Sequence, residues 1–268
     1  MKNHISLFIF AIALLSGPVS ANDLSMTAVK DTLASIPGEH NYIYVRTPLG
    51  EDEEKNYDEI TFYDGLGREL DFAQSYGADR AGAIMAHHHL IEYDSLGRKE
   101  KQWLSTNTSF SYMSPEDLKG GVLWDYHDAG KRSYLQTNYE SSPLNRITEQ
   151  YGVGDAWGDH PARMEYLTNI PADSLRCSFY FIDDNDSLIR RGDYRSGELQ
   201  VTKATDEDGK PTYTFVDKQG RTLLTRLGRG NQQADTYFVF DRFGRIRYVL
   251  PPMINDEISA GNLDLYAY

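Results

Sequence analysis

One six-residue pattern returns along the chain and constrains its fold more than any other feature. It reads aromatic residue, Asp, two variable residues, Gly and Arg. Its clearest copies are Tyr63-Asp64-Gly65-Leu66-Gly67-Arg68, Tyr93-Asp94-Ser95-Leu96-Gly97-Arg98 and Phe240-Asp241-Arg242-Phe243-Gly244-Arg245. In a further copy, Val216-Asp217-Lys218-Gln219-Gly220-Arg221, an aliphatic residue replaces the aromatic one. The recurrence predicts repeated local structure.

Each fixed position of the pattern suits a tight turn between two β-strands. The Asp carboxylate can accept hydrogen bonds from backbone N–H groups two residues on, and Gly readily adopts the positive φ at which the turn rejoins the strand. The aromatic residue and Arg then begin the two strands. There Arg can form an exposed ion pair with Asp, which stabilises by about 0–1 kcal/mol. The pattern therefore predicts hairpin turns whose Asp, Gly and Arg residues are structural rather than catalytic.

The first residues predict export. Lys2 precedes an apolar run from Ile5 to Leu15, and the breaker Gly17-Pro18 and the small residues Val19-Ser20-Ala21 follow. This order is typical of a secretory signal peptide, so we expect residues 1–21 to be cleaved near Ala21. The run is shorter than the roughly 20 apolar residues of a bilayer span. We therefore expect a mature chain without a membrane span, in the periplasm, on the cell surface or outside the cell.

Composition and charge narrow the class of protein. The chain is 40% hydrophobic and 12% aromatic, which is enough for a sizeable core. Its net charge of −13 argues against nucleic acid as a partner. Cys177 is the only cysteine, so the exported chain has no internal disulfide and depends on packing. It precedes a predicted strand, residues 178–182, where a buried structural role is expected.

The rest of the chain predicts a mainly antiparallel all-β fold with one or two short helices. Residues 22–40 are expected to be a linker or short helix, residues 41–252 a β domain and residues 253–268 a C-terminal tail. Ser114-Pro115-Glu116-Asp117 is typical of a helix start, with a capping Ser, Pro in the first turn and acidic residues beside it. Alternating strands at residues 199–202, 212–215 and 245–250 predict one buried face each.

Two kinds of sequence could be mistaken for metal sites. In a strand, His87 and His89 of the run His87-His88-His89 share one face, but no further ligands occur at a familiar spacing. The acidic stretches Asp183-Asp184-Asn185-Asp186 and Asp206-Glu207-Asp208 lack the spacing of a calcium loop, so we expect solvated turns there. The acidic run at residues 51–55 is typical of a solvated loop. We predict no metal, no cofactor and no catalytic residues, although metal binding at the histidines or acidic turns stays open.

The repeats resemble a known family. Tyr-Asp-x-x-Gly-Arg turns in an exported chain are similar to the YD repeats of rearrangement-hotspot (RHS) proteins. Longer stretches resemble a domain of unknown function near the N-terminus of large RHS-type proteins from Bacteroidetes. These stretches are residues 63–68, 139–152, 165–169, 197–209 and 248–252, so the resemblance covers the chain from about Asn41 to Pro252.

The resemblance implies a fold and a setting. In that family, which includes polymorphic toxin systems, the repeats build a long β-sheet that spirals into a hollow shell, often around a variable C-terminal toxin. Here the pattern does not return after Pro252. We therefore expect hairpins that form one continuous sheet, partly wrapped or not, without the shell core or toxin. No catalytic residue carries over from the family.

Three functions remain as hypotheses at this stage. The first is a non-catalytic structural or interaction module of an RHS system, which pairs with a partner or with itself through an edge strand in the final hairpin, Tyr237 to Leu250. The second is a surface protein that binds glycans through exposed aromatic side chains. The third is a secreted hydrolase, for which the sequence shows no carboxylate pair at a recognisable separation.

Overall fold

A computed structural model describes residues 26–252, apart from residues 35, 39, 49–55, 79–82, 128–129 and 229–232. The predicted signal peptide, the acidic run at residues 51–55 and the predicted C-terminal tail lie outside the described residues. Within the described part of the chain, neither α-helix is long and apolar enough to span a bilayer.

The described chain consists mainly of strands, with two α-helices. The first half contains α1 (Met26–Ala34), β1 (Asn41–Pro48), β2 (Asn56–Tyr63), β3 (Glu69–Ala78), β4 (Ile84–Tyr93), β5 (Lys99–Trp103), β6 (Thr106–Ser109), α2 (Pro115–Asp125) and β7 (Tyr134–Tyr139). Next come β8 (Ile147–Tyr151), η2 (Asp155–Trp157), β9 (Ala162–Thr168), η3 (Asp173–Leu175), β10 (Ser178–Ile182) and β11 (Leu188–Asp193). The last strands are β12 (Gln200–Thr205), β13 (Pro211–Val216), β14 (Thr222–Leu227), β15 (Ala234–Phe240) and β16 (Ile246–Leu250).

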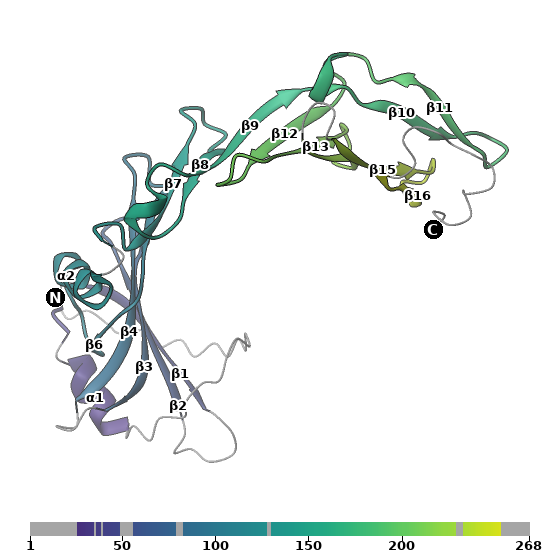
Figure 1. Cartoon of the computed structure of the whole chain (residues 1–268). Helices are drawn as coiled ribbons and strands as arrows, with labels where there is room; N and C mark the ends of the chain where they lie inside the picture. Colours follow the sequence, from purple (N-terminus) through teal and green to yellow (C-terminus); the bar gives the residue numbers. More distant parts are fainter. Residues whose placement is uncertain are drawn as a thin grey trace. The chain divides into compact units, whose positions relative to one another are not determined.

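Fourteen strands join one antiparallel sheet in which most strands pair with their neighbours in the chain (Figure 1). The order is β1-β2-β3-β4-β5-β7-β8-β9-β12-β13-β14-β15-β16, with β6 attached to β4. The predicted all-β, mainly antiparallel fold with one or two short helices is confirmed. The sheet is open, and β1 and β16 stand at its two ends.

One hairpin departs from the expected continuous sheet. Strands β10 and β11 pair only with each other in the described structure and form a separate two-stranded sheet. Their excursion begins after β9 and ends before β12, and these two strands pair directly. Asn169 closes the excursion: its buried side chain donates to the carbonyl of Arg195 at 2.8 Å and accepts from the N–H of Leu199 at 2.8 Å. These bonds span about thirty residues, and the local hairpin pattern contains no sign of them.

Four hairpins share an irregularity directly after the turn. Tyr63 pairs with Glu69, but Phe62 pairs with Asp71, so Leu70 is an extra residue on the second strand. The same shift follows the turns at Asp94, Asp217 and Asp241. A bulge of this kind increases the local twist of a strand pair. The repeated hexamer thus corresponds to one repeated unit of turn plus bulge.

The described chain forms two compact units. The first comprises residues up to 137 together with 151–158, and the second comprises 138–150 and the residues from 159 onward. In the first unit, Val29 of α1 and Phe110 pack into a core with Ile60 and Phe62 of β2. Helix α2 begins as predicted, with the Ser114 hydroxyl accepting from the N–H of Asp117.

Glycine allows α2 to lie close to the strand before it. A Cβ atom added at Gly121 would come within 2.6 Å of the Thr106 hydroxyl on β6. Leu118 and Val122 of the same helix are buried. Glycine lowers helix propensity, but at position 121 it provides room for close packing, whereas at position 120 nothing lies within 4 Å.

In the second unit the core lies between the large sheet and the β10–β11 hairpin. Tyr180 and Leu188 of the hairpin are buried with Phe215, Leu224 and other apolar residues of β12 to β16. The rings of Tyr180 and Tyr237 meet edge to face, with centroids 4.8 Å apart. Cys177 is buried in this cluster, where it packs as a small apolar residue.

Candidate interaction surfaces

The first turn shows how the hexamer closes a hairpin. One carboxylate oxygen of Asp64 accepts from the N–H groups of Leu66 and Arg68, both at 2.9 Å. The other accepts from the Arg68 guanidinium at 2.7 Å. Gly67 has φ of 77°, which side chains other than glycine rarely adopt. Both functions of Asp, as backbone acceptor and as ion-pair partner, are used within six residues.

The same bonds recur at the other three predicted turns. Asp94, Asp217 and Asp241 hold the side chains of Arg98, Arg221 and Arg245 at 2.7–2.8 Å. Gly97, Gly220 and Gly244 have φ of 81°, 80° and 79°. These bonds lower the pKa of the carboxyl groups. At Asp241 the backbone N–H of Arg245 contributes most, whereas at Asp64 burial acts to raise the pKa and the hydrogen bonds outweigh it.

Two of the four turn arginines, Arg68 and Arg221, also reach beyond their own turns, and this contact escapes sequence reasoning. The guanidinium of Arg68 lies 4.4 Å from the ring centroid of Tyr93, the aromatic residue of the next copy. Arg221 lies 5.1 Å from the ring of Phe240 in the same way. A cation over an aromatic face is attracted by the ring quadrupole. In these two pairs of hairpins, the aromatic residue of the later copy is the platform for the arginine of the copy before it.

A longer turn reproduces this arrangement with different residues. Arg146 makes two bonds to the carboxylate of Glu140, at 2.8 and 2.7 Å, and lies 4.4 Å from the ring of Tyr166. These bonds, chiefly those of the Arg146 side chain, lower the pKa of Glu140 to about 2. Asn145, with φ of 54°, stands where the hexamer has Gly. Stacking on the next strand therefore tolerates changes in the turn itself.

Two acidic stretches that could be mistaken for metal loops are further turns of the same kind. Asp206 accepts from the N–H groups of Asp208 and Lys210, and Gly209 has φ of 78°. Asp183 accepts from two N–H groups likewise, and Asp186 stands in the glycine place with φ of 59°. Both stretches were predicted as solvated turns, and the spacing of Asp206, Gly209 and Lys210 was the signal that could have related the first to the hexamer.

The His87-His88-His89 run divides between two environments. His88 is buried, with its ring nitrogens 2.6 Å from Asp71 and 2.9 Å from the carbonyl of Ser109. His87 stacks on Tyr76 with ring centroids 4.4 Å apart. Among the described residues, no three His, Cys, Asp or Glu side chains gather as metal ligands would.

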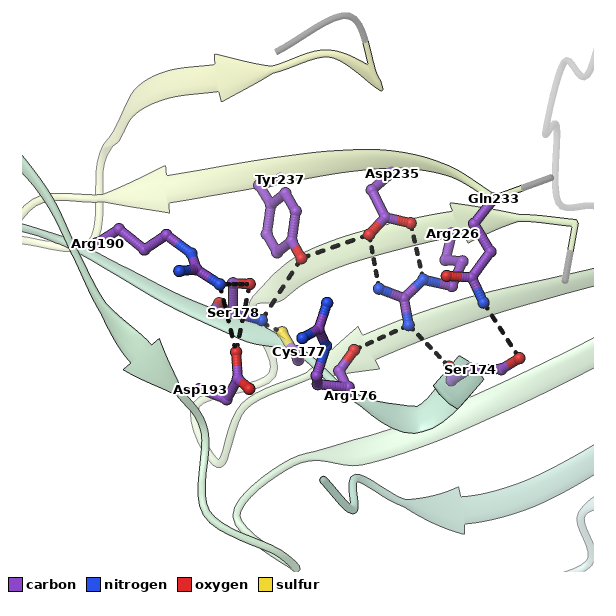
Figure 2. A network of polar contacts seen from close by, with 10 residues as sticks. All are labelled: Ser174, Arg176, Cys177, Ser178, Arg190, Asp193, Arg226, Gln233, Asp235 and Tyr237. Atoms are coloured by element: carbon purple, nitrogen blue, oxygen red, sulfur yellow. Dashed lines mark hydrogen bonds and ion pairs between the residues drawn. The ribbon is translucent and has the colours of Figure 1, made fainter. Parts of the chain in front are cut away.

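A buried arginine connects strands β14 and β15 of the second unit to the segment that leads into the β10–β11 hairpin (Figure 2). Arg226 of β14 makes two bonds to Asp235 of β15, at 2.7 and 2.6 Å. Its remaining nitrogen donates to the carbonyls of Ser174 and Arg176, at 3.0 and 2.8 Å. All three guanidinium nitrogens of Arg226 are thus hydrogen-bonded. The side chain of Gln233 also donates to the Ser174 hydroxyl, at 3.2 Å, so two side chains hold the segment leading into β10.

Beside this clamp lies an open groove of about 500 Å³. Strand β10 forms one wall, and parts of β14 and β15 with the turns at Asp217 and Asp241 form the other. The walls carry both aromatic and polar side chains, and polar side chains lie at the turn end. The lining includes Phe179, Phe181, Tyr194, Phe238, Phe240, Gln219, Arg221 and Arg242.

Comparison with known proteins gives limited matches. Residues 41–168, somewhat less than half of the chain, match a domain of unknown function, DUF6443. A crystal structure of TcdB2-TccC3-Cdc42 is similar with a TM-score of 0.48 and 14% identity over 81% of this chain. A structure of TcdB2-TccC3 gives a TM-score of 0.47 and 12% identity over 91% of this chain. No curated protein matches.

The chain spans only 10% and 12% of the chains in those two structures. TM-scores below 0.5 leave the likeness too low to establish a shared fold. The domain match, by contrast, covers strands β1 to β9. It is compatible with the expected resemblance to RHS-type proteins.

Proposed function

We propose that this chain is an exported, non-catalytic structural module of an RHS-type, YD-repeat system, which pairs with another protein through edge strand β16. The observation that carries the proposal is the series of arginine contacts between successive hairpins. Arg68 and Arg221 each cover the aromatic residue of the following copy. In these two hairpins the turn arginine has its full set of contacts only because another strand lies beside the hairpin.

The last described copy has no such successor among the described residues. The Arg245 side chain is 69% exposed, against 32% for Arg68 and 34% for Arg221. It bonds to Asp241 and lies 5.2 Å from the ring of Phe243, within its own turn. Strand β16 pairs with β15 on one side only in the described structure. A partner strand would pair with the backbone of β16 and place a ring over Arg245.

Two further parts of the proposal depend on the sequence. Export follows from the apolar run after Lys2 and the small residues before Asn22. A non-catalytic role is supported by the use of the repeat carboxylates, which close turns and bind arginines. Secretion of the full chain with cleavage near Ala21, and inactivity toward generic glycosidase and esterase substrates, are the expected results. Cytoplasmic retention would contradict export, and turnover would contradict the non-catalytic role.

Edge pairing is tested by the oligomeric state of the mature chain. Light scattering after size exclusion, over a series of concentrations, should show reversible self-association, because a second copy presents the same open edge. Val249→Pro removes a backbone N–H in β16 and should shift the equilibrium toward monomer. Arg242→Ala, an exposed turn substitution, is the control. A monomer at every concentration before and after Val249→Pro would rule out self-pairing through this edge.

A further inference from the structure

The first unit has an open sheet edge of its own. Strand β1 pairs with β2 through all eight of its residues, Asn41–Pro48, without a register shift, and no other described strand pairs with it. Natural edge strands are commonly blunted by bulges, lysines or prolines. In β1 only Pro48, the last residue, is of this kind. The outer side of β1 is therefore a long and regular edge at which a further strand can pair.

The side chains of β1 leave no unpaired charge along this edge. Arg46 is the only charged residue of the strand, and it makes two bonds to Asp58 of β2, at 2.7 and 2.9 Å. The Tyr44 hydroxyl donates to the same carboxylate at 2.6 Å. Ile43 lies on the opposite face of the strand and is 50% exposed. A neighbouring strand would thus meet neutral groups and cover an apolar side chain.

The regions that carry the two open edges differ in the sign of their charge. The final hairpin, residues 234–250, contains three arginines and two aspartates, and β16 itself contains Arg247 and no acidic residue. Arg245, directly before β16, is 69% exposed although it bonds to Asp241. In the first unit, by contrast, acidic side chains outnumber basic ones. Two β16 edges would therefore repel each other, whereas β16 and the edge of the first unit attract.

We propose that β16 of one copy pairs with β1 of a second copy, so that the two open edges of the sheet are partners of each other. This inference rests on the proposed pairing through β16 and names its partner. Because the two edges differ, each added copy covers one open edge and brings another. Such a heterologous interface does not close on itself after two copies as an isologous one does. Self-association should therefore continue beyond the dimer as the concentration rises.

Opposite charges at one position of β1 provide the first test. Ile43→Lys places a cation beside the basic hairpin of the second copy and removes an apolar contact, so it should weaken self-association of the mature chain about tenfold. Ile43→Glu removes the same contact but places an anion there, so it should weaken association less. Sedimentation over a concentration series measures both effects. Both variants should keep the thermal transition of the parent chain; if Ile43→Lys lowers it, Thr47→Lys on the same face takes its place.

Mixing two blocked chains identifies which edges pair. Val249→Pro leaves β1 open, and Ile43→Lys leaves β16 open. Each chain alone should be largely monomeric, whereas an equimolar mixture should form a one-to-one complex. A chain that carries both substitutions is the control, and it should form no complex with either single variant beyond what that variant forms alone at its blocked edge.

Three results would overturn the inference: Ile43→Lys associates as strongly as the parent chain, Ile43→Glu weakens association as much as Ile43→Lys, or the mixture stays monomeric. If Ile43→Lys associates like the parent while Val249→Pro is monomeric, β16 pairs with a second β16, and the proposed pairing through β16 stands without β1. A parent chain that is monomeric at every concentration would overturn self-pairing through either edge.

Discussion

The two units use the same turns but cover their sheets differently. In the first unit, α1 and the segment around Phe110 pack on β2 to β4. In the second unit, the β10–β11 hairpin packs on β12 to β16. The hexamer thus specifies how neighbouring strands are joined and leaves open what covers the sheet.

The buried charged side chains also differ between the two units. The first unit buries Asp71 and His88 as neighbours within the sheet, on β3 and β4. The second unit buries Arg226, whose bonds leave the sheet and reach the segment before β10. One polar cluster therefore joins strands that are already paired, whereas the other attaches a cover. The difference teaches that a buried charge can determine which segment folds over a sheet.

The largest expected effect is at the clamp. Arg226→Ala should destabilise the second unit by about 3–5 kcal/mol, because Asp235 loses its partner and two backbone carbonyls lose their donors. The three tryptophans, Trp103, Trp124 and Trp157, all belong to the first unit. Urea unfolding should therefore show a shifted circular dichroism transition with little change in tryptophan fluorescence. Equal shifts in both signals would mean that the two units unfold together.

A somewhat smaller effect is expected at the buried pair of the first unit. His88→Leu should cost about 3 kcal/mol, because Asp71 stays buried without its partner. This loss should appear in tryptophan fluorescence. The double variant Asp71→Leu with His88→Leu should recover most of it, since a matched apolar pair leaves no charge to desolvate. A double variant as unstable as the single one would show that shape, and not charge, limits this site.

The smallest expected effect is a difference in stability between alanine substitutions at two turn glycines of the first unit. Gly67→Ala and Gly97→Ala both place a Cβ atom at positive φ, which costs about 1–2 kcal/mol. At Gly97 the new Cβ atom would also lie 3.1 Å from the Arg68 guanidinium, whereas at Gly67 nothing lies within 4 Å. Thermal unfolding should therefore show a greater loss for Gly97→Ala. Equal losses would mean that Arg68 moves away without cost.

The sequence was most informative where the bonds are local. Asp64 and Gly67 determine a turn through groups at most four residues away, so the pattern alone suffices. The acidic stretches at Asp183 and Asp206 were predicted correctly as turns, but their similarity to the hexamer was not predicted. Asp186 takes the place of Gly in the first, and Lys210 takes the place of Arg in the second.

The remaining features depend on distant residues. Arg226 meets Ser174 across 52 positions, and no propensity along β14 indicates that its side chain holds a loop. His88 was correctly placed on the face opposite His87 and His89, but its partner Asp71 lies on another strand. The aromatic residues of the hexamer were assigned to strand starts, and their second use beneath Arg68 and Arg221 required the register between hairpins.

The bulge after the four hexamer turns has a consequence for how such a chain can vary in length. Each of these four hairpins carries its own closure and its own extra residue, so adding or deleting one of them whole preserves the alternation of inward and outward side chains in all the others. Deleting a single strand would instead reverse the chain direction of everything downstream. Genes that encode such sheets can therefore gain or lose hairpins in pairs of strands without rewriting the rest.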